Sequence, residues 1–355
     1  MTAAYFPGGV SMLSTVAQFR RAGNAKKKVF SILDRYGMIR KETFPAIIPP
    51  TSGVIIDKKT ARRQRMAAQT KEVLFCMSEE CTHDCSTCSA NCASREGGEP
   101  ESLLAPLNPR SSVKKAVAVM SGKGGVGKSL VTSLLACEAA RRGYRTGILD
   151  GDVTGPSIPA SFGLHQKADS DGEVLYPVRS KTGIDVMSVN LLLENETDPV
   201  IWRGPIIGGV IRQFWTDVLW DDVDFLFVDM PPGTGDAQLT LLQSLPIAGI
   251  VIVTSPQELV GMIVSKAVGM AKMMNVPLLG VVENMSWAEC PKCGEKLYLF
   301  GESNLEETAL RYDTPILARL PLDPAVAAAV DRGEVESLPG DRVKTAMDVI
   351  ARLLK

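Results

Sequence analysis

The chain has 355 residues, of which 45% are hydrophobic and 22% are charged, and this composition suits one large globular domain with an additional segment. The net charge of −1 hides an uneven distribution, because residues 1–76 carry 14 Lys and Arg against 4 Asp and Glu. Residues 77–355 are therefore acidic overall, which argues against a main domain that wraps nucleic acid. The longest apolar run, Ile247–Val253, is far shorter than the roughly 18 residues of a membrane span and is typical of a buried strand.

Residues 1–76 form a basic zone without sustained hydrophobic periodicity. In the first twenty residues the positive charges follow the apolar part, which is the wrong order for a secretory signal. We therefore expect a cytoplasmic protein, in which cysteines stay reduced and serve metal binding more than disulfides. Met77 stands at the end of the basic zone, so residues 1–76 are either an over-extended gene start or a genuine extension of unknown role.

Residues 77–110 form a cysteine-rich segment followed by a linker. Four thiols lie within twelve residues, at Cys81, Cys85, Cys88 and Cys92. Four thiolates are enough to hold one metal centre without help from elsewhere, and zinc and an iron–sulfur cluster both suit them. Cys76 lies just outside this group, and His83 is an alternative ligand within it. The Gly-, Glu-, Pro- and Ser-rich stretch Arg95–Ser102 is typical of a linker.

From residue 111 to residue 355, apolar strands alternate with helical runs. The expected strands are Lys115–Met120, Thr146–Asp150, Phe225–Asp229, Ile247–Thr254, Pro277–Glu283 and Pro315–Arg319. The expected helices include Lys128–Arg142, Val260–Met274 and Pro324–Arg332, and Gly172–Met187 has the alternation of a hairpin. Nearly continuous apolar strands separated by helices predict an α/β domain, with a mostly parallel sheet covered by helices on both faces.

A glycine-rich loop separates the first expected strand from the first expected helix, at Gly122, Lys123, Gly124, Gly125, Val126, Gly127, Lys128 and Ser129. Glycines allow successive backbone N–H groups to converge on phosphate oxygens, and the helix N-terminus adds its dipole. A strand before and a helix after the loop are the context that a P-loop requires. We expect Lys128 to reach the terminal phosphates of the nucleotide and the Ser129 hydroxyl to ligate Mg²⁺.

Two acidic positions at strand ends complete the predicted phosphate site. Asp229 ends a buried strand at the carboxyl edge of the sheet, where we expect it to hold Mg²⁺ through water. The loop Pro231–Asp236 that follows is a candidate sensor of the γ-phosphate. Asp150 and Asp152 follow the second strand, and Asp152 either orients the attacking water or caps a helix.

The remaining cysteines fall into two kinds. Cys290 and Cys293 form a CxxC pair in a loop, which is compatible with half a zinc site, a redox pair or half the ligands of an iron–sulfur cluster. The redox interpretation lacks a thioredoxin-like context, and no second CxxC follows in this domain to complete a zinc ribbon. Cys137 lies on the apolar side of the helix after the P-loop and is most simply a core residue.

Lys123 is a second lysine early in the loop, and the loop thereby resembles the deviant P-loop of the MinD/ParA/nitrogenase-iron-protein class. This resemblance implies that Lys123 reaches the partner's nucleotide across a dimer interface and plays the part of an arginine finger.

Over about Val113–Leu354 the chain resembles the Mrp/ApbC-type iron–sulfur cluster carrier ATPases. The motifs that carry the resemblance are the P-loop, Asp150–Pro159, Trp202–Pro205, Asp229–Asp236, Glu283–Ser286, the CPKC pair and Leu320–Pro324. The resemblance implies a homodimer that hydrolyses ATP slowly with Mg²⁺, shares a transferable [4Fe–4S] cluster between its CxxC pairs and delivers it to apo iron–sulfur proteins. It implies no nucleic-acid or membrane partner, and it places Asn284 at the position that recognises the adenine base.

The chain departs from the family at its amino terminus. It lacks the small domain that many bacterial relatives carry there, and the Cys81–Cys92 spacing is not that of the eukaryotic cytosolic relatives.

Three other functions compete with the carrier. A MinD/ParA-like positioning ATPase acting at membrane or DNA would use the amphipathic tail Val343–Leu354, although its few basic residues favour a helix packed on the sheet. That function also leaves the CPKC pair without a role. An electron-transfer ATPase like the nitrogenase iron protein would share a cluster, but from cysteines that are not a CxxC pair. A zinc-binding P-loop regulator is the third.

Overall fold

The computed structural model describes residues 104–153, 155–195, 204–233, 235–256 and 260–355. The predictions for the basic zone, for Met77 and for the thiols Cys81–Cys92 therefore lie outside the described residues, as do Trp202 and Arg203. Among the residues that are described, no helix is both long and apolar enough to cross a membrane.

Eight strands form one sheet, in the order β10-β7-β6-β1-β5-β2-β4-β3. They are β1 (Val113–Met120), β2 (Thr146–Asp150), β3 (Val178–Arg179), β4 (Asp185–Met187), β5 (Val223–Asp229), β6 (Ile247–Thr254), β7 (Leu278–Glu283) and β10 (Ile316–Arg319). All neighbouring pairs are parallel except β3 and β4. The predicted parallel sheet is confirmed, and the predicted hairpin is a shorter antiparallel pair at the sheet edge.

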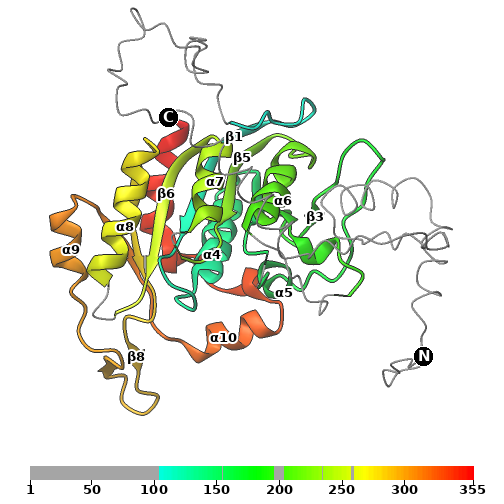
Figure 1. The fold of residues 1–355 in the computed structure, drawn as a ribbon. Helices are drawn as coiled ribbons and strands as arrows, with labels where there is room; N and C mark the ends of the chain where they lie inside the picture. The colour runs from blue at the N-terminus through cyan, green and yellow to red at the C-terminus, as the bar shows by residue number, and fades with distance from the viewer. Residues whose placement is uncertain (1–103, 154, 196–203, 234, 257–259) are drawn as a thin grey trace, which may run out of the picture. The chain divides into compact units, whose positions relative to one another are not determined.

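Helices cover both faces of the sheet (Figure 1). They are α4 (Lys128–Arg141), α5 (Ile158–Ser161), α6 (Gly204–Thr216), α7 (Asp236–Ser244), α8 (Val260–Met273), α9 (Leu305–Arg311), α10 (Pro324–Asp331) and α11 (Lys344–Ala351). Short 3-10 turns span Val189–Leu191, Val335–Ser337, Gly340–Val343 and Arg352–Leu354. Alternate β1 residues face the two layers: Ala118 packs toward α6, α7 and α8, and Val119 packs toward α4 and α11. Two apolar cores result, one on each side of the sheet.

The carboxyl-terminal helix α11 packs on the body of the domain. Ala346, Met347 and Ile350 are fully buried in the same core as α4. This burial confirms the prediction of a final helix on the sheet, and it removes the feature that favoured a membrane-acting ATPase.

A separate two-stranded hairpin projects from the domain after β7 (gold, Figure 1). It consists of β8 (Ala288–Glu289) and β9 (Lys296–Leu297), which pair antiparallel. The CPKC sequence forms the turn between them, so the fold presents both thiols at the tip of a projection.

Candidate nucleotide site and cysteine hairpin

The glycine loop connects the buried end of β1 to the start of α4. Gly125 and Gly127 have φ angles of 81° and 83°, in the left-handed region that favours glycine. At Gly127 space is limiting as well, because a Cβ there would lie 2.2 Å from the Asn284 side-chain nitrogen. Residues 123–125 are exposed to solvent. The predicted loop therefore has the backbone conformation and the open face that phosphate binding needs.

Asp229 is fully buried at the end of β5 and is the centre of a hydrogen-bond network behind this loop. Its Oδ2 accepts from Lys128 Nζ at 2.8 Å and from Ser129 Oγ at 2.6 Å. Its Oδ1 accepts from Thr132 Oγ1 at 2.8 Å. A buried carboxylate needs such partners, because burial of an unpaired charge is costly. The structure thus brings together Ser129 and Asp229, whose oxygens are donors of the kind that Mg²⁺ prefers.

Thr132 was not among the residues singled out from the sequence. It lies one helical turn beyond Lys128 and Ser129 on α4 and so shares their face. This spacing is a signal from which the third partner of Asp229 could have been found.

Asp150 and Asp152 occupy different environments at the end of β2. Asp150 is fully buried beside Asp229 in the sheet register and accepts from Ser188 Oγ at 2.9 Å and from the Asp152 N–H at 3.1 Å. Burial, and next the charge of Asp229, raise the pKa of Asp150 to about 8. The raised pKa disfavours a second negative charge beside Asp229.

Asp152 is partly accessible, and its Oδ2 lies 3.8 Å from Lys128 Nζ. The next helix, α5, begins at Ile158 with Ser157 at its N-cap position. Asp152 is thus not the cap of that helix. Asp152 lies beside Lys128, and its role toward the attacking water stays a prediction.

Residues 231–233 of the predicted sensor loop lie beside the P-loop. The Gly233 N–H donates to the Ser121 carbonyl at 3.1 Å, and the Gln238 side chain donates to the Pro231 carbonyl at 2.6 Å. A γ-phosphate sensor needs such proximity.

Asn284 follows β7 and is almost completely buried beneath the glycine loop. Its side-chain amide donates to the Val126 carbonyl at 3.0 Å, and its backbone N–H donates to the Thr254 carbonyl at 2.8 Å. The structure therefore joins Asn284 to the P-loop, while recognition of adenine stays a prediction.

The two CPKC thiols lie in a tight turn between β8 and β9. The Cys290 N–H donates to the Glu295 carbonyl and the Gly294 N–H donates to the Cys290 carbonyl, each at 2.9 Å. Both thiols are free, Cys290 partly exposed and Cys293 exposed. Hydrogen bonds from the Lys292 and Cys293 backbone N–H groups, and then the Cys293 thiol, lower the pKa of Cys290. The turn therefore favours the thiolate, which is the form that binds iron.

Within the described part of the chain, no group of three or more His, Cys, Asp or Glu side chains has the arrangement of a metal site. The hairpin of one chain thus offers a pair of thiols and no third ligand from these residues. Cys137, by contrast, is buried in the core, where burial raises its pKa to about 12. The predicted core role of Cys137 is confirmed.

A parallel sheet with a glycine loop, a following helix and an acidic strand end defines a P-loop NTPase. Residues 112–355 match the ParA family model described as an NUBPL iron-transfer P-loop NTPase, and the chain belongs to this family.

Curated relatives and a solved structure agree with the family. The iron-sulfur cluster carrier protein of Clostridium perfringens is 44% identical in an alignment of 265 residues, and the match covers 71% of this chain and 93% of that protein. The iron-sulfur cluster carrier protein of Methanococcus maripaludis is 42% identical, over 72% of this chain and 90% of that protein. A nucleotide-binding protein of Archaeoglobus fulgidus, solved in complex with ADP, is 45% identical with a TM-score of 0.58, over 64% of this chain and 90% of its own. The resemblance inferred from the motifs is confirmed.

Proposed function

We propose that this chain is an ATP-dependent carrier that holds a [4Fe–4S] cluster at Cys290 and Cys293 and delivers it to apo iron–sulfur proteins. One observation carries the proposal: a P-loop NTPase domain presents two free thiols at the tip of a projecting hairpin. Relatives that match most of this chain at more than 40% identity are named iron-sulfur cluster carrier proteins. Exposed thiolates suit cargo that must leave, since an exposed site is easier to vacate than a buried cage.

In the proposed ATP site, Lys128 exchanges its contact with Asp229 for the terminal phosphates. Ser129 and Asp229 would hold Mg²⁺, and the bound ion would neutralise charge on the phosphates. Asp152, beside Lys128, orients the attacking water, and Asn284 recognises the base. Thr132 keeps Asp229 in place, because its hydroxyl binds the carboxylate oxygen that Lys128 and Ser129 do not use.

The active form in this proposal is a homodimer. A [4Fe–4S] cluster takes four thiolates, and each hairpin offers two, so a two-fold pair of hairpins completes the ligand set. Four consecutive apolar residues beside the cysteines, Leu297, Tyr298, Leu299 and Phe300, are between 42% and 60% exposed. An exposed apolar strip of this kind supports association. The hairpin residues 288–297 carry two Lys and two Glu, so the hairpin has no net charge to oppose association with a second copy.

We place the protein in the cytoplasm, because thiolates at an exposed position need a reducing compartment to remain available for iron.

Anaerobic incubation of the full chain with iron and sulfide, followed by mixing with an apo [4Fe–4S] enzyme, tests the proposal. We expect a visible cluster absorption and activation of the acceptor by wild type. Cys290→Ala and Cys293→Ala, each made together with Ser at the amino-terminal positions 81, 85, 88 and 92, are expected to activate nothing. Wild-type protein that acquires no iron, or that retains it in the presence of every acceptor, would contradict the carrier function. Zinc in place of iron in anaerobically purified protein would favour a P-loop regulator instead.

A further inference from the structure

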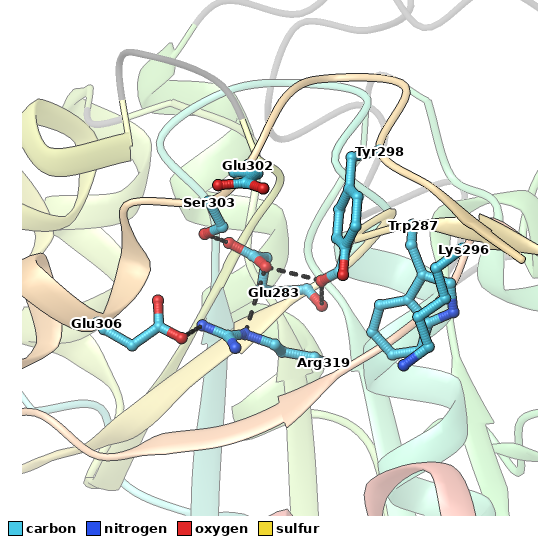
Figure 2. Close-up of a pocket in the computed structure, with 9 residues that line it drawn as sticks. Glu283, Trp287, Lys296, Tyr298, Glu302, Ser303, Glu306 and Arg319 are labelled. Atoms are coloured by element: carbon cyan, nitrogen blue, oxygen red, sulfur yellow. Dashed lines mark hydrogen bonds and ion pairs between the residues drawn. The ribbon is translucent and has the colours of Figure 1, made fainter.

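The buried Glu283 carboxylate forms hydrogen bonds with both ends of the segment 286–303, which contains the two cysteines. Glu283 is the last residue of β7 and is fully buried. It accepts a hydrogen bond from Ser286 Oγ at 2.7 Å, where the segment begins, and from Ser303 Oγ, where the segment ends. Figure 2 shows Ser303 beside this carboxylate, and all three residues line a cavity of about 410 Å³. We name Glu283, Ser286 and Ser303 the carboxylate clasp.

A cation completes the surroundings of the clasp. Arg319 Nε lies 3.6 Å from Glu283 Oε2, and the same guanidinium forms an ion pair with Glu306 on α9 (Figure 2). A fully buried carboxylate is stable only with such partners. Loss of the hydrogen bond from either serine therefore destabilises the buried Glu283 carboxylate. The intact clasp is for this reason the preferred state of the segment.

The residue after Glu283 belongs to the nucleotide loop. Asn284 donates to the Val126 carbonyl, and no Cβ fits at Gly127 because the Asn284 amide occupies that space. Met285 then adopts a φ of 60°, a left-handed conformation that is uncommon for a residue with a side chain. This turn directs Asn284 toward the P-loop and Ser286 back to Glu283. Two hydrogen bonds also hold the backbone of this turn in place. The Ser286 N–H donates to the Leu320 carbonyl, and the Leu320 N–H donates to the Glu283 carbonyl.

We infer that Glu283 is a positioning residue that couples the nucleotide loop to the cysteine hairpin. Nucleotide that engages the P-loop shifts Asn284, and the adjacent Glu283 transmits this shift through Ser286 and Ser303 to the segment that carries Cys290 and Cys293. The thiols thereby change their accessibility with the state of the nucleotide site. The inference rests on the proposed function only in taking the two thiols as the cargo site.

Alkylation of the thiols in the full, metal-free chain tests this coupling. Iodoacetamide is applied under reducing, anaerobic conditions without nucleotide, with MgADP and with a Mg-bound non-hydrolysable ATP analogue, and each cysteine is followed by peptide mass spectrometry. For wild type we expect nucleotide to change the alkylation rates of Cys290 and Cys293 by about fivefold, the lower end of ordinary coupling between sites. Cys137 is the internal control, because it is buried and stays unreactive while the domain is folded.

Two variants separate coupling from folding. Ser303→Ala removes the contact with Glu283 and the hydrogen bond that Ser303 Oγ accepts from the Leu305 N–H. Ser303 is not part of the P-loop, so nucleotide should bind as in wild type while the rates of Cys290 and Cys293 stop responding to it. Ser303→Thr keeps the hydroxyl and should restore the response. Glu283→Gln should also abolish it. Ser180→Ala is the matched control, since Ser180 Oγ donates to a glutamate, Glu336, elsewhere in the domain at 2.6 Å.

The inference is overturned if wild-type thiols react equally with and without nucleotide, or if Ser303→Ala and Glu283→Gln retain the full response. Iron loading is scored separately on the same proteins. A chain whose thiols respond to nucleotide but hold no cluster would contradict the proposed function and not the coupling.

Discussion

At the scale of single residues, the nucleotide site depends on Lys128, whose ammonium group lies close to two acidic side chains. Lys128 Nζ is bonded to Asp229 at 2.8 Å and lies 3.8 Å from Asp152, and its side chain is only 5% exposed. A cation so placed is already desolvated, and we expect it to neutralise phosphate negative charge once it exchanges Asp229 for the nucleotide. Its removal affects both the nucleotide and the buried carboxylate.

Lys128→Ala is therefore expected to lower the rate of phosphate release from ATP at least about 100-fold, the usual effect of removing one preorganised charge from a transition state. Lys114→Ala is the control, because Lys114 is an exposed lysine of the same domain that pairs with Asp224. Circular dichroism should show a folded chain for both variants. Hydrolysis at the wild-type rate by Lys128→Ala would exclude this lysine from the chemistry.

The Cys290 thiol should titrate at a lower pH than the thiol of an ordinary cysteine. Two backbone N–H groups, from Lys292 and Cys293, stabilise its thiolate, and this lowers its pKa. A lowered pKa means that alkylation of Cys290 stays fast as the pH falls toward neutrality, where an ordinary thiol has lost most of its thiolate. The pH profile of site-resolved alkylation measures this. Because backbone donors are the main cause, Cys293→Ser should preserve the low midpoint, and a midpoint at or above that of a free cysteine would contradict the assignment.

At the scale of elements, the sequence predicts the central strands well for a physical reason. A parallel strand buried on both faces is apolar almost throughout, so Thr146–Asp150 and Ile247–Thr254 have the same bounds in the sequence and in the structure. The sequence does not predict helix α6, because this helix begins with Gly and Pro and contains two further glycines, which are weak helix formers. Its stability comes from tertiary packing, in which Phe214 and Trp215 are buried against the sheet.

The contact between β7 and β10 should be intolerant of one extra carbon. Gly280 has a φ of 150°, and a Cβ there would lie 2.5 Å from Leu317 Cγ and from the Pro315 carbonyl oxygen. Overpacking and backbone strain together predict that Gly280→Ala lowers the free energy of unfolding by about 2–4 kcal/mol in urea titrations. Gly269→Ala on α8 is the matched control, because nothing lies within 4 Å of its Cβ position. That variant should gain about 0.5–1 kcal/mol, and equal effects of the two substitutions would contradict the packing argument.

At the scale of the whole molecule, the partners of the site residues come from distant segments. Lys128, Ser129 and Asp229 were identified from local motifs and lie together in the structure. Ser188 reaches Asp150 only because β4 pairs with β2, and no local pattern announces that neighbour. The carboxylate clasp is similar, since Ser303 is separated from Glu283 by twenty positions. Sequence therefore indicates the chemical groups, whereas topology decides which groups hold them in place.

Substitution of Lys123 tests whether the active form is a dimer, because this lysine is predicted to reach the partner's nucleotide. It lies in the exposed part of the P-loop, where a second subunit has access to it. Lys123→Ala should bind nucleotide as wild type does and hydrolyse ATP about 10³-fold more slowly, as expected for a residue that acts like an arginine finger. An equal mixture of Lys123→Ala and Lys128→Ala should regain about one quarter of the wild-type rate, since half of the dimers are mixed and each has one complete site. A mixture that stays inactive would place Lys123 in its own subunit's site.

The cluster itself gives the second test of the dimer. If two hairpins share one [4Fe–4S] cluster, the chain with Ser at positions 81, 85, 88 and 92 should load about four irons per dimer. It should also sediment as a dimer when loaded. Cys290→Ala or Cys293→Ala removes two of the four ligands, one from each subunit, so iron should be lost while ATP still binds. Because the exposed strip Leu297–Phe300 would be covered in the loaded dimer, Leu299→Glu should weaken the loaded dimer, and Leu310→Glu on α9, an apolar residue that is 84% exposed, should not. A loaded monomer, or a full cluster in either cysteine variant, would show that one subunit supplies all the ligands.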